Sequence, residues 1–376
     1  ENVYPLTNGV SYNSYVIMDK KTCLLDTVDE SICNTFIKKV SEVLGLRKLD
    51  YLVINHMEPD HSATISNLLQ KYPDVTIICN DKILAMFKNY FEDVAMPYVQ
   101  VIKEGEVLDL GEHKLTFVFT PMVHWPDNMV TYSEEDKILF SNDIYGQHLA
   151  SSKRFDSEVG LEISLQEAKK YYANIVLPYT KQAYKIASLA KNLDIEMIAT
   201  SHGVIWRDHI PEILDLYDNM TTSAKQDKAV VVYDTMWGST AKIAKAISEG
   251  FAEAGVTVSL FNINDTHASD IITQVMESKY LAIGSPTFNN NILPEIASFL
   301  CYLKGLAPVG LKYISFGSYG WGGQSVQIIK DELEALKFEE LLPAIKQLYF
   351  PTNDNLQLIK QTAGYRLQKQ TGRYKT

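Results

Sequence analysis

The sequence has no closely spaced cysteines. Its four cysteines are scattered along 376 residues and form no Cys-x-x-Cys pair: Cys23, Cys33, Cys79 and Cys301. This spacing argues against a disulfide framework, a thiolate zinc site and a rubredoxin-type iron site. Dispersed cysteines in an acidic chain are typical of the reducing cytoplasm, where we expect the protein to be. Any metal site must therefore use histidine and carboxylate ligands.

Long apolar runs and blocks of basic residues are also missing. No apolar stretch approaches the roughly 18 residues of a membrane-spanning helix. The net charge of −11 argues against nucleic acid or an anionic membrane as the main partner. The opening ENVYPLTNG lacks the basic and apolar regions of a signal peptide. Because the chain begins with Glu1 and not with Met, we expect some N-terminal residues to be missing.

What is present has the composition of a folded globular protein, with 46% apolar and 22% charged residues. The length predicts two or three domains. The polar stretch MTTSAKQDK at 220–228 separates an amphipathic helix pattern from the buried-strand pattern AVVVYD. We therefore expect one domain at 1–222 and another at 228–376.

The two parts have different secondary-structure patterns. In the second part, strand-like runs such as AVVVYD, TVSLFNIN and YLAIGSP alternate with helical patterns, which predicts a doubly wound parallel sheet. The first part has many strand-like runs and helices near 30–45, 165–175 and 180–192. This pattern favours a mixed α/β sandwich of sheets with helices outside.

Four strand-like runs in the first part end in side chains that can bind a metal. LDYLVIN is followed by His56, Glu58, Asp60 and His61. The other three runs end at His124, Asp143 and His202. Strand ends on one side of a sheet converge in space, so these loops can form a single site.

A lone histidine after a strand is more often a hydrogen-bonded structural group than a metal ligand. We interpret His113, His209 and His267 in that way. Two histidines and two carboxylates within six positions are different, because their crowding is costly unless a cation offsets it. Seven mixed nitrogen and oxygen ligands suit two metals with one bridging carboxylate. Such ligands favour non-haem iron, although zinc and manganese also accept them.

The pattern His-x-Glu-x-Asp-His at 56–61 resembles the metallo-β-lactamase motif His-x-His-x-Asp-His, with Glu58 in place of a histidine. Three features are similar to the flavodiiron proteins: that replacement, the stretch HWPDNM that begins at the third histidine, His124, and the stretch SNDIYGQH around Asp143. The spacing between ligands and the order of the two parts also match. The resemblance implies a metallo-β-lactamase-like αββα sandwich followed by a flavodoxin-like doubly wound sheet.

The resemblance also implies a ligand set and an activity. It gives one iron to His56, Glu58 and His124, the other to Asp60, His61 and His202, and makes Asp143 the bridge. It implies that FMN passes electrons to the irons, which reduce O2 to water, NO to N2O, or both. The candidates for groups close to the irons that influence the preference for O2 or NO are Tyr12, Tyr145 and His148. For His148, a purely structural role is given equal weight.

Three loops follow strands of the second part and are expected to bind a flavin. The first is a hydroxyl-rich turn before a helix, which offers backbone N–H groups to a phosphate. The other two carry glycine or asparagine and aromatic side chains that can flank an isoalloxazine ring. Together they resemble flavodoxin and predict FMN. The residues are Thr235, Met236, Trp237, Gly238, Ser239, Thr240, Pro286, Thr287, Phe288, Asn289, Asn290, Ser318, Tyr319, Gly320, Trp321 and Gly322.

The resemblance implies partners as well. A rubredoxin-like protein or reduced deazaflavin is the expected electron donor, and a head-to-tail homodimer or a dimer of dimers would place one subunit's FMN beside the other's irons. Two alternatives are a zinc-dependent hydrolase fused to a flavodoxin-like domain, and an electron carrier whose first part is an inert scaffold.

Overall fold

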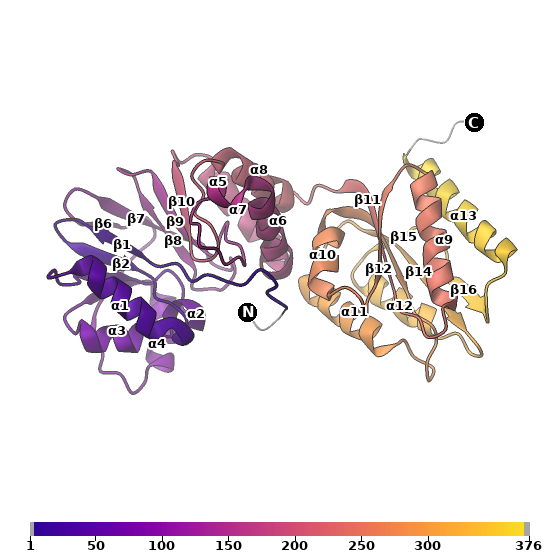
Figure 1. The fold of residues 1–376 in the computed structure, drawn as a ribbon, viewed down its shortest axis with the longest axis horizontal. Helices are drawn as coiled ribbons and strands as arrows, with labels where there is room; N and C mark the ends of the chain where they lie inside the picture. The colour runs from indigo at the N-terminus through magenta and orange to yellow at the C-terminus, as the bar shows by residue number, and fades with distance from the viewer. Residues whose placement is uncertain (1–3, 372–376) are drawn as a thin grey trace. The chain divides into compact units, whose positions relative to one another are not determined.

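The computed structural model describes residues 4–371, which form two compact units. The first unit consists of Leu6–Tyr171 and Tyr179–Thr221. The second unit consists of residues 4–5, Tyr172–Pro178 and 222–371. Figure 1 shows the chain coloured from indigo in the first unit to yellow at the end of the second.

The first unit contains two five-stranded sheets. In one, β1 pairs antiparallel with β2, and β2 to β5 run parallel. In the other, β6 to β9 are antiparallel and β10 is parallel to β9. The strands are β1 Tyr15–Met18, β2 Thr22–Leu25, β3 Tyr51–Val53, β4 Thr76–Cys79, β5 Tyr98–Val101, β6 Val107–Asp109, β7 Lys114–Phe119, β8 Met129–Ser133, β9 Ile138–Asn142 and β10 Met197–Thr200.

Helices cover the sheets because each presents an apolar stripe. In α1 (Cys33–Leu44), Phe36, Val40 and Leu44 recur every four residues and are buried. They join a core that contains Leu24 and Phe117 from the two sheets. Helices α1 to α4 and α5 to α8 lie on opposite sides of the sheets (Figure 1). The remaining helices are α2 Pro59–Ser62, α3 Ile65–Lys71, α4 Asp81–Tyr90, α5 Asp156–Val159, α6 Leu161–Tyr171, α7 Thr180–Ala190 and α8 Ile210–Thr221.

The second unit has a six-stranded parallel sheet in the order β12-β11-β13-β14-β15, with β16 also paired to β14. The strands are β11 Gln226–Tyr233, β12 Thr257–Asn262, β13 Ser278–Gly284, β14 Lys312–Tyr319, β15 Glu339–Glu340 and β16 Ile345–Leu348. The helices are α9 Ser239–Glu253, α10 Ala268–Glu277, α11 Pro294–Leu306, α12 Ser325–Ala335 and α13 Asn353–Thr371. The predicted sandwich and the predicted doubly wound sheet are both confirmed.

Some local features differ from the prediction. The helix expected near 165–175 ends as α-helix at Tyr171 and continues as a short π-helix, Tyr172–Val176. Strand β5 was not predicted, because its side chains are largely exposed and show no buried run. Helix α13 was missed because its stretch is mostly polar. None of the helices in residues 4–371 combines the length and apolarity that crossing a bilayer requires.

Candidate metal centre

The seven side chains predicted as ligands lie together in the first unit. They come from the loops that follow β3, β7, β9 and β10. Four of them are almost fully buried, and the other three are partly exposed. The buried side chains are His56, His61, Asp143 and His202, and the partly exposed ones are Glu58, Asp60 and His124.

The local sequence explains how the loop after β3 presents its ligands. Glu58 precedes Pro59, and a residue before proline is restricted to extended backbone, here with a ψ of 141°. Pro59 then starts α2, because proline is well accepted in the first turn of a helix. The helix carries Asp60 and His61 directly after this turn. Four ligand candidates are thereby placed within one short segment.

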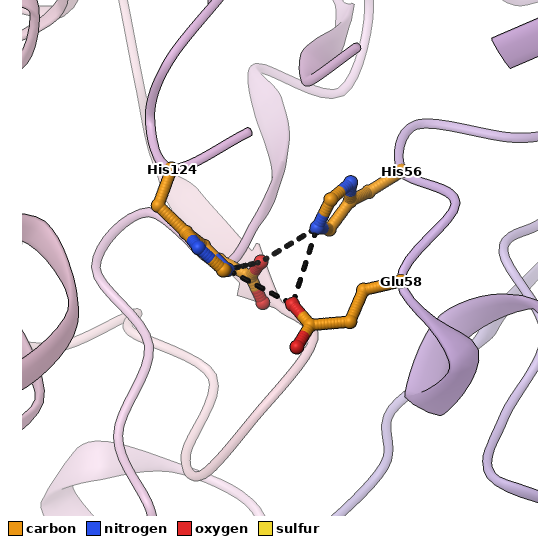
Figure 2. Close-up of side chains that lie close together, drawn as sticks. His56, Glu58 and His124 are labelled. Atoms are coloured by element: carbon orange, nitrogen blue, oxygen red, sulfur yellow. Dashed lines mark hydrogen bonds and ion pairs between the residues drawn. The ribbon is translucent and has the colours of Figure 1, made fainter. Parts of the chain in front are cut away.

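One cluster contains two histidines and two carboxylates. The Nε2 atom of His124 lies 3.0 Å from Glu58 Oε2, and Nε2 of His56 lies 3.4 Å from the same oxygen. Figure 2 shows these three side chains pointing toward one another. Asp143 Oδ2 lies 3.3 Å from His124 Nε2 and 3.8 Å from His56 Nε2. One potential ligand atom from each residue falls within 4.8 Å of the others.

The second cluster is built from Asp60, His61 and His202. Asp60 Oδ2 lies 3.2 Å from His202 Nε2, and Asp60 Oδ1 lies 3.5 Å from His61 Nε2. The other oxygen of Asp143, Oδ1, faces this cluster, at 3.0 Å from His61 Nε2 and 3.4 Å from His202 Nε2. The two oxygens of Asp143 thus face different clusters, which is the arrangement of a bridging carboxylate.

The pKa shifts in the two clusters favour positive charge between the side chains. Burial alone would lower the pKa of His56, but the hydrogen bonds that its ring donates to the carboxylates of Asp127 and Glu58 raise that pKa to about 10. At His124, too, burial would lower the pKa, but hydrogen bonds to the carboxylates of Asp143 and Glu58 raise it to about 9. The histidines around Asp143 overcome its burial and hold its pKa well below the usual range. A metal cation can take the place of the protons that these shifts favour.

Two buried oxygens test the fit of a metal. Asp60 Oδ1 and Asp143 Oδ2 are shielded from solvent, and neither accepts a hydrogen bond. A buried carboxylate oxygen without a donor is costly, and metal coordination would satisfy it. Mixed imidazole and carboxylate ligands suit iron. The side chains therefore fit two neighbouring metal ions that share Asp143.

The histidine rings are held from behind by hydrogen bonds. His202 Nδ1 donates to the carbonyl of Ser11 at 2.8 Å, and His56 Nδ1 donates to Asp127 Oδ2 at 2.9 Å. A carbonyl only accepts, so His202 carries its hydrogen on Nδ1 and turns Nε2 toward the cluster. The sequence prediction missed Asp127, although its signal was present in HWPDNM.

The candidates for groups close to the metals have different surroundings. Tyr12 and His148 both place ring edges against His202, with ring centroids 5.9 Å and 5.5 Å away. Burial, followed by the nearby His202, lowers the pKa of His148 to about 3, so His148 is neutral. Tyr145 is buried and packs on Tyr217. Tyr171, which the sequence prediction missed, packs against His148 at 4.9 Å.

The three predicted flavin loops of the second unit are joined by hydrogen bonds. They follow β11, β13 and β14, which are neighbours in the sheet. Thr240 and Ser318 connect the first and third loops through their hydroxyls at 2.8 Å. The backbone N–H of Thr287 in the second loop donates to the Ser318 carbonyl at 2.9 Å. The loops therefore form one continuous rim at the carboxyl edge of the sheet, where ligands bind in such folds.

The rim combines a polar turn with exposed aromatic rings. Gly238 has a φ of +87° where α9 begins, and its N–H donates to Thr235 Oγ1 at 3.0 Å. Trp237 and Trp321 are 81% and 83% exposed, which leaves their rings free to cover a planar ligand. Phe288 is half exposed. The other predicted residues lie in the same three loops or at the ends of the elements that adjoin them: Met236, Ser239, Pro286, Asn289, Asn290, Tyr319, Gly320 and Gly322.

Two family models match separate parts of the chain. The family model described as "ODP family beta lactamase" matches residues 10–203, about half of the chain. The Flavodoxin family model matches residues 231–359.

Individual relatives span nearly the whole chain. A nitric oxide reductase of Moorella thermoacetica is 38% identical over 93% of this chain and 88% of its own. The rubredoxin oxygen:oxidoreductase of Desulfovibrio gigas has a similar structure, with a TM-score of 0.95 and 34% identity, covering 99% of this chain and 94% of its own. The flavodiiron protein of Giardia intestinalis superposes with a TM-score of 0.94 at 29% identity over 99% and 93%.

Proposed function

The chain belongs to the flavodiiron protein family, and from that premise we propose that it reduces O2, NO or both at a non-haem di-iron centre supplied with electrons by FMN. Relatives named for each reaction support the two gases, since one is a nitric oxide reductase and another a rubredoxin oxygen:oxidoreductase. The observation that carries the proposal is Asp143, whose two oxygens face two separate ligand clusters. The protein is an oxidoreductase that uses FMN and iron.

We propose the following ligands. His56, Glu58 and His124 hold one iron, Asp60, His61 and His202 hold the other, and Asp143 bridges them. The rim of three loops in the second unit holds FMN. When bound, the iron pair would supply electrons and positive charge for the reduction of a diatomic gas, and FMN would supply the electron relay from a donor.

The side chains of the centre have distinct roles in this proposal. Asp143 fixes the separation of the two clusters, because one rigid carboxylate is shared between them. Asp127 and the Ser11 carbonyl orient His56 and His202 through Nδ1. The more open ligands are Glu58, Asp60 and His124, with side chains 25%, 13% and 13% exposed. Their exposed side is therefore the approach for a small gas molecule.

The alternative of a zinc-dependent hydrolase is not favoured. Glu58 replaces a nitrogen ligand of the hydrolytic motif with an oxygen, which suits iron better than zinc. An inert first unit is also disfavoured, because all seven ligand candidates are present and converge.

Partners, domains and location are further parts of the proposal. Electron tunnelling needs a short distance, so a head-to-tail dimer or dimer of dimers would bring one subunit's FMN to the other's irons. A rubredoxin-like protein or reduced deazaflavin would supply electrons. We assign the di-iron centre to residues 1–222 and FMN to 228–376, whose ends 1–3 and 372–376 lie outside the described residues. The four cysteines are free thiols, which suits a reducing cytoplasm.

Anaerobic turnover tests the proposed function. Protein with measured iron and FMN contents would be reduced and mixed separately with O2 and with NO. We expect two irons and one FMN per chain, and oxidation of the protein by at least one gas. Two zincs, no iron and no oxidation by either gas would contradict the proposal.

A further inference from the structure

Asp127 lies outside the two clusters and its side chain is hydrogen-bonded to a proposed ligand. Its Oδ2 atom accepts from His56 Nδ1 at 2.9 Å and from the backbone N–H of Met57 at 2.8 Å. The side chains of Asp127 and His56 are both 0% exposed. The Asp127 carbonyl accepts from Asn80 Nδ2 at 2.8 Å, and Asn80 caps α4. Asp127 is therefore held rigidly behind the His56 ring.

This contact fixes which nitrogen of His56 faces the cluster. A carboxylate accepts hydrogen bonds and has no hydrogen to donate, so the imidazole hydrogen resides on Nδ1. The other nitrogen, Nε2, is then free on the side of Glu58 Oε2, at 3.4 Å. A charged acceptor also draws the Nδ1 hydrogen away from the ring more strongly than a neutral one does, which makes Nε2 a better electron donor.

The second cluster has a neutral acceptor at the matching place. His202 Nδ1 donates to the Ser11 carbonyl. The nearby buried carboxylate, Asp26, accepts from the backbone and side chain of Asn55 and from the side chain of Asn142. Asp26 therefore uses its oxygens on amide donors. The Asp26 carboxylate also attracts His61 electrostatically, but no hydrogen bond joins the two side chains in the described residues. The two clusters therefore differ in the acceptor that is hydrogen-bonded to a ligand ring, which is a carboxylate at His56 and a neutral carbonyl at His202.

We propose that Asp127 is a positioning residue that fixes the tautomer of His56 and makes the iron held by His56, Glu58 and His124 the more electron-rich of the pair. This inference rests on the proposed di-iron centre. A more basic ligand stabilises the ferric form and lowers the reduction potential of its iron. The iron beside Asp127 is then the one with the lower potential.

Asp127→Asn tests the inference in the iron- and FMN-loaded protein. The amide keeps the shape and one acceptor oxygen but removes the negative charge. We expect iron to be lost to a chelator about 10- to 100-fold more readily than from the unsubstituted protein. A redox titration would be followed by the EPR signal of the half-reduced iron pair. The lower of the two iron reduction potentials should rise, so that the difference between the two reduction potentials becomes smaller.

Asp156→Asn is the matched control. Asp156 is also 0% exposed, and its carboxylate accepts only from backbone N–H groups near the start of α8, those of Arg207, Asp208 and His209. This variant loses the same charge from the interior of the same unit. It should lower the free energy of unfolding of the first unit without changing iron retention or the reduction potential of either iron.

The outcomes separate the inference from the proposed function. If Asp127→Asn retains iron as well as the control does, and the difference between the two iron reduction potentials is unchanged or larger, Asp127 is a structural residue only. If the variant does not fold, NMR tests the inference on the unsubstituted protein, labelled with 15N at its histidines and loaded with zinc. The Nδ1 hydrogen of His56 should then resonate downfield of that of His202, and the reverse order would overturn the inference. Absence of iron from the unsubstituted protein would instead refute the proposed function.

Discussion

At the scale of single residues, Glu58 is the position that distinguishes the proposed di-iron centre from a hydrolytic zinc site. The motif around it otherwise matches a zinc hydrolase, and only this side chain exchanges nitrogen for oxygen. Its carboxylate contacts both His56 and His124. His124 and Asp143 complete the same cluster, so removal of one member should disable the centre without disturbing the second unit.

His124→Asn should abolish reduction of O2 and NO and leave FMN bound. Loss of a ligand is expected to lower turnover more than about 100-fold, beyond the usual effect of changing an outer hydrogen-bond partner. Gas consumption, iron content and flavin absorbance would be measured on the same sample. His267→Asn is the control, because His267 caps α10 in the second unit and asparagine is also a good N-cap. Unchanged turnover in His124→Asn would support the electron-carrier alternative.

His113 is a titratable group that belongs to neither ligand cluster. Its Nδ1 lies 2.9 Å from Asp19 Oδ2, and its Nε2 lies 3.3 Å from Asp136 Oδ2. The hydrogen bond to Asp19 raises the pKa of His113, with further contributions from Asp136 and Glu135. The charged imidazole thereby fastens the turn between β6 and β7 to the end of β1.

This raised pKa predicts a pH dependence of stability. The stabilisation is fully present below the unfolded-state pKa of about 6.5 and is lost as pH rises through the higher folded-state pKa. His113→Gln should remove that component of the pH dependence, measured as the free energy of unfolding of the first unit across neutral pH. His209→Gln, at another partly exposed histidine, is the control. An identical pH profile for His113→Gln and the unsubstituted protein would show that the ion pair contributes nothing.

At the scale of elements, the contact between α9 and α13 depends on the absence of a side chain. A Cβ atom at Gly250 of α9 would lie 2.3 Å from the carbonyl oxygen of Lys360 and 3.1 Å from Ala363 Cβ, both in α13. A backbone atom cannot move aside as a flexible side chain can. The two helices therefore approach closely only because position 250 is glycine.

Gly250→Ala should destabilise the second unit by about 1–3 kcal/mol, because overpacking forces the backbone to shift. Gly305→Ala is the matched comparison in α11, where no atom lies within 4 Å of the added Cβ. Alanine is the better helix former, so this second substitution should be neutral or stabilise by up to about 1 kcal/mol. Thermal unfolding of the FMN-loaded protein would measure both. Equal effects of the two substitutions would contradict the close helix contact.

At the scale of the whole molecule, each compact unit has its own core and its own cofactor site. The core of the first unit contains Leu52 and Phe117, and a core of the second contains Val231 and Phe316. The ligand clusters lie entirely in the first unit, and the flavin rim lies entirely in the second. Cofactor binding should therefore stabilise the two units separately.

Removal of iron by a chelator should lower the melting transition of the first unit, and removal of FMN should lower that of the second. A ligand present at about 1,000 times its dissociation constant stabilises the unit that binds it by about 4 kcal/mol. Differential scanning calorimetry of the loaded, iron-free and FMN-free protein would resolve the transitions. A single transition that responds equally to both cofactors would be incompatible with separate sites.

Most of the fold could be predicted from the sequence because its signals are local. Buried runs such as AVVVYD and the four-residue spacing of Phe36, Val40 and Leu44 directly indicate strands and helices. Helix α13 escaped prediction because it is mostly polar and is held by only a few buried side chains, among them Ala363 and Leu367. Strand β5 escaped because an exposed edge strand has no buried face to reveal it.

The sequence by itself determined which chemistry is available: four histidines and three carboxylates at strand ends, Glu58 among them, and a hydroxyl-rich turn before a helix. Only the tertiary structure decided how these groups face one another. The two oxygens of Asp143 point to different clusters, and Asp127 stands behind a histidine 71 positions away in the chain. Such contacts join separate loops, so they follow from the packing of sheets and helices and not from any local pattern of residues.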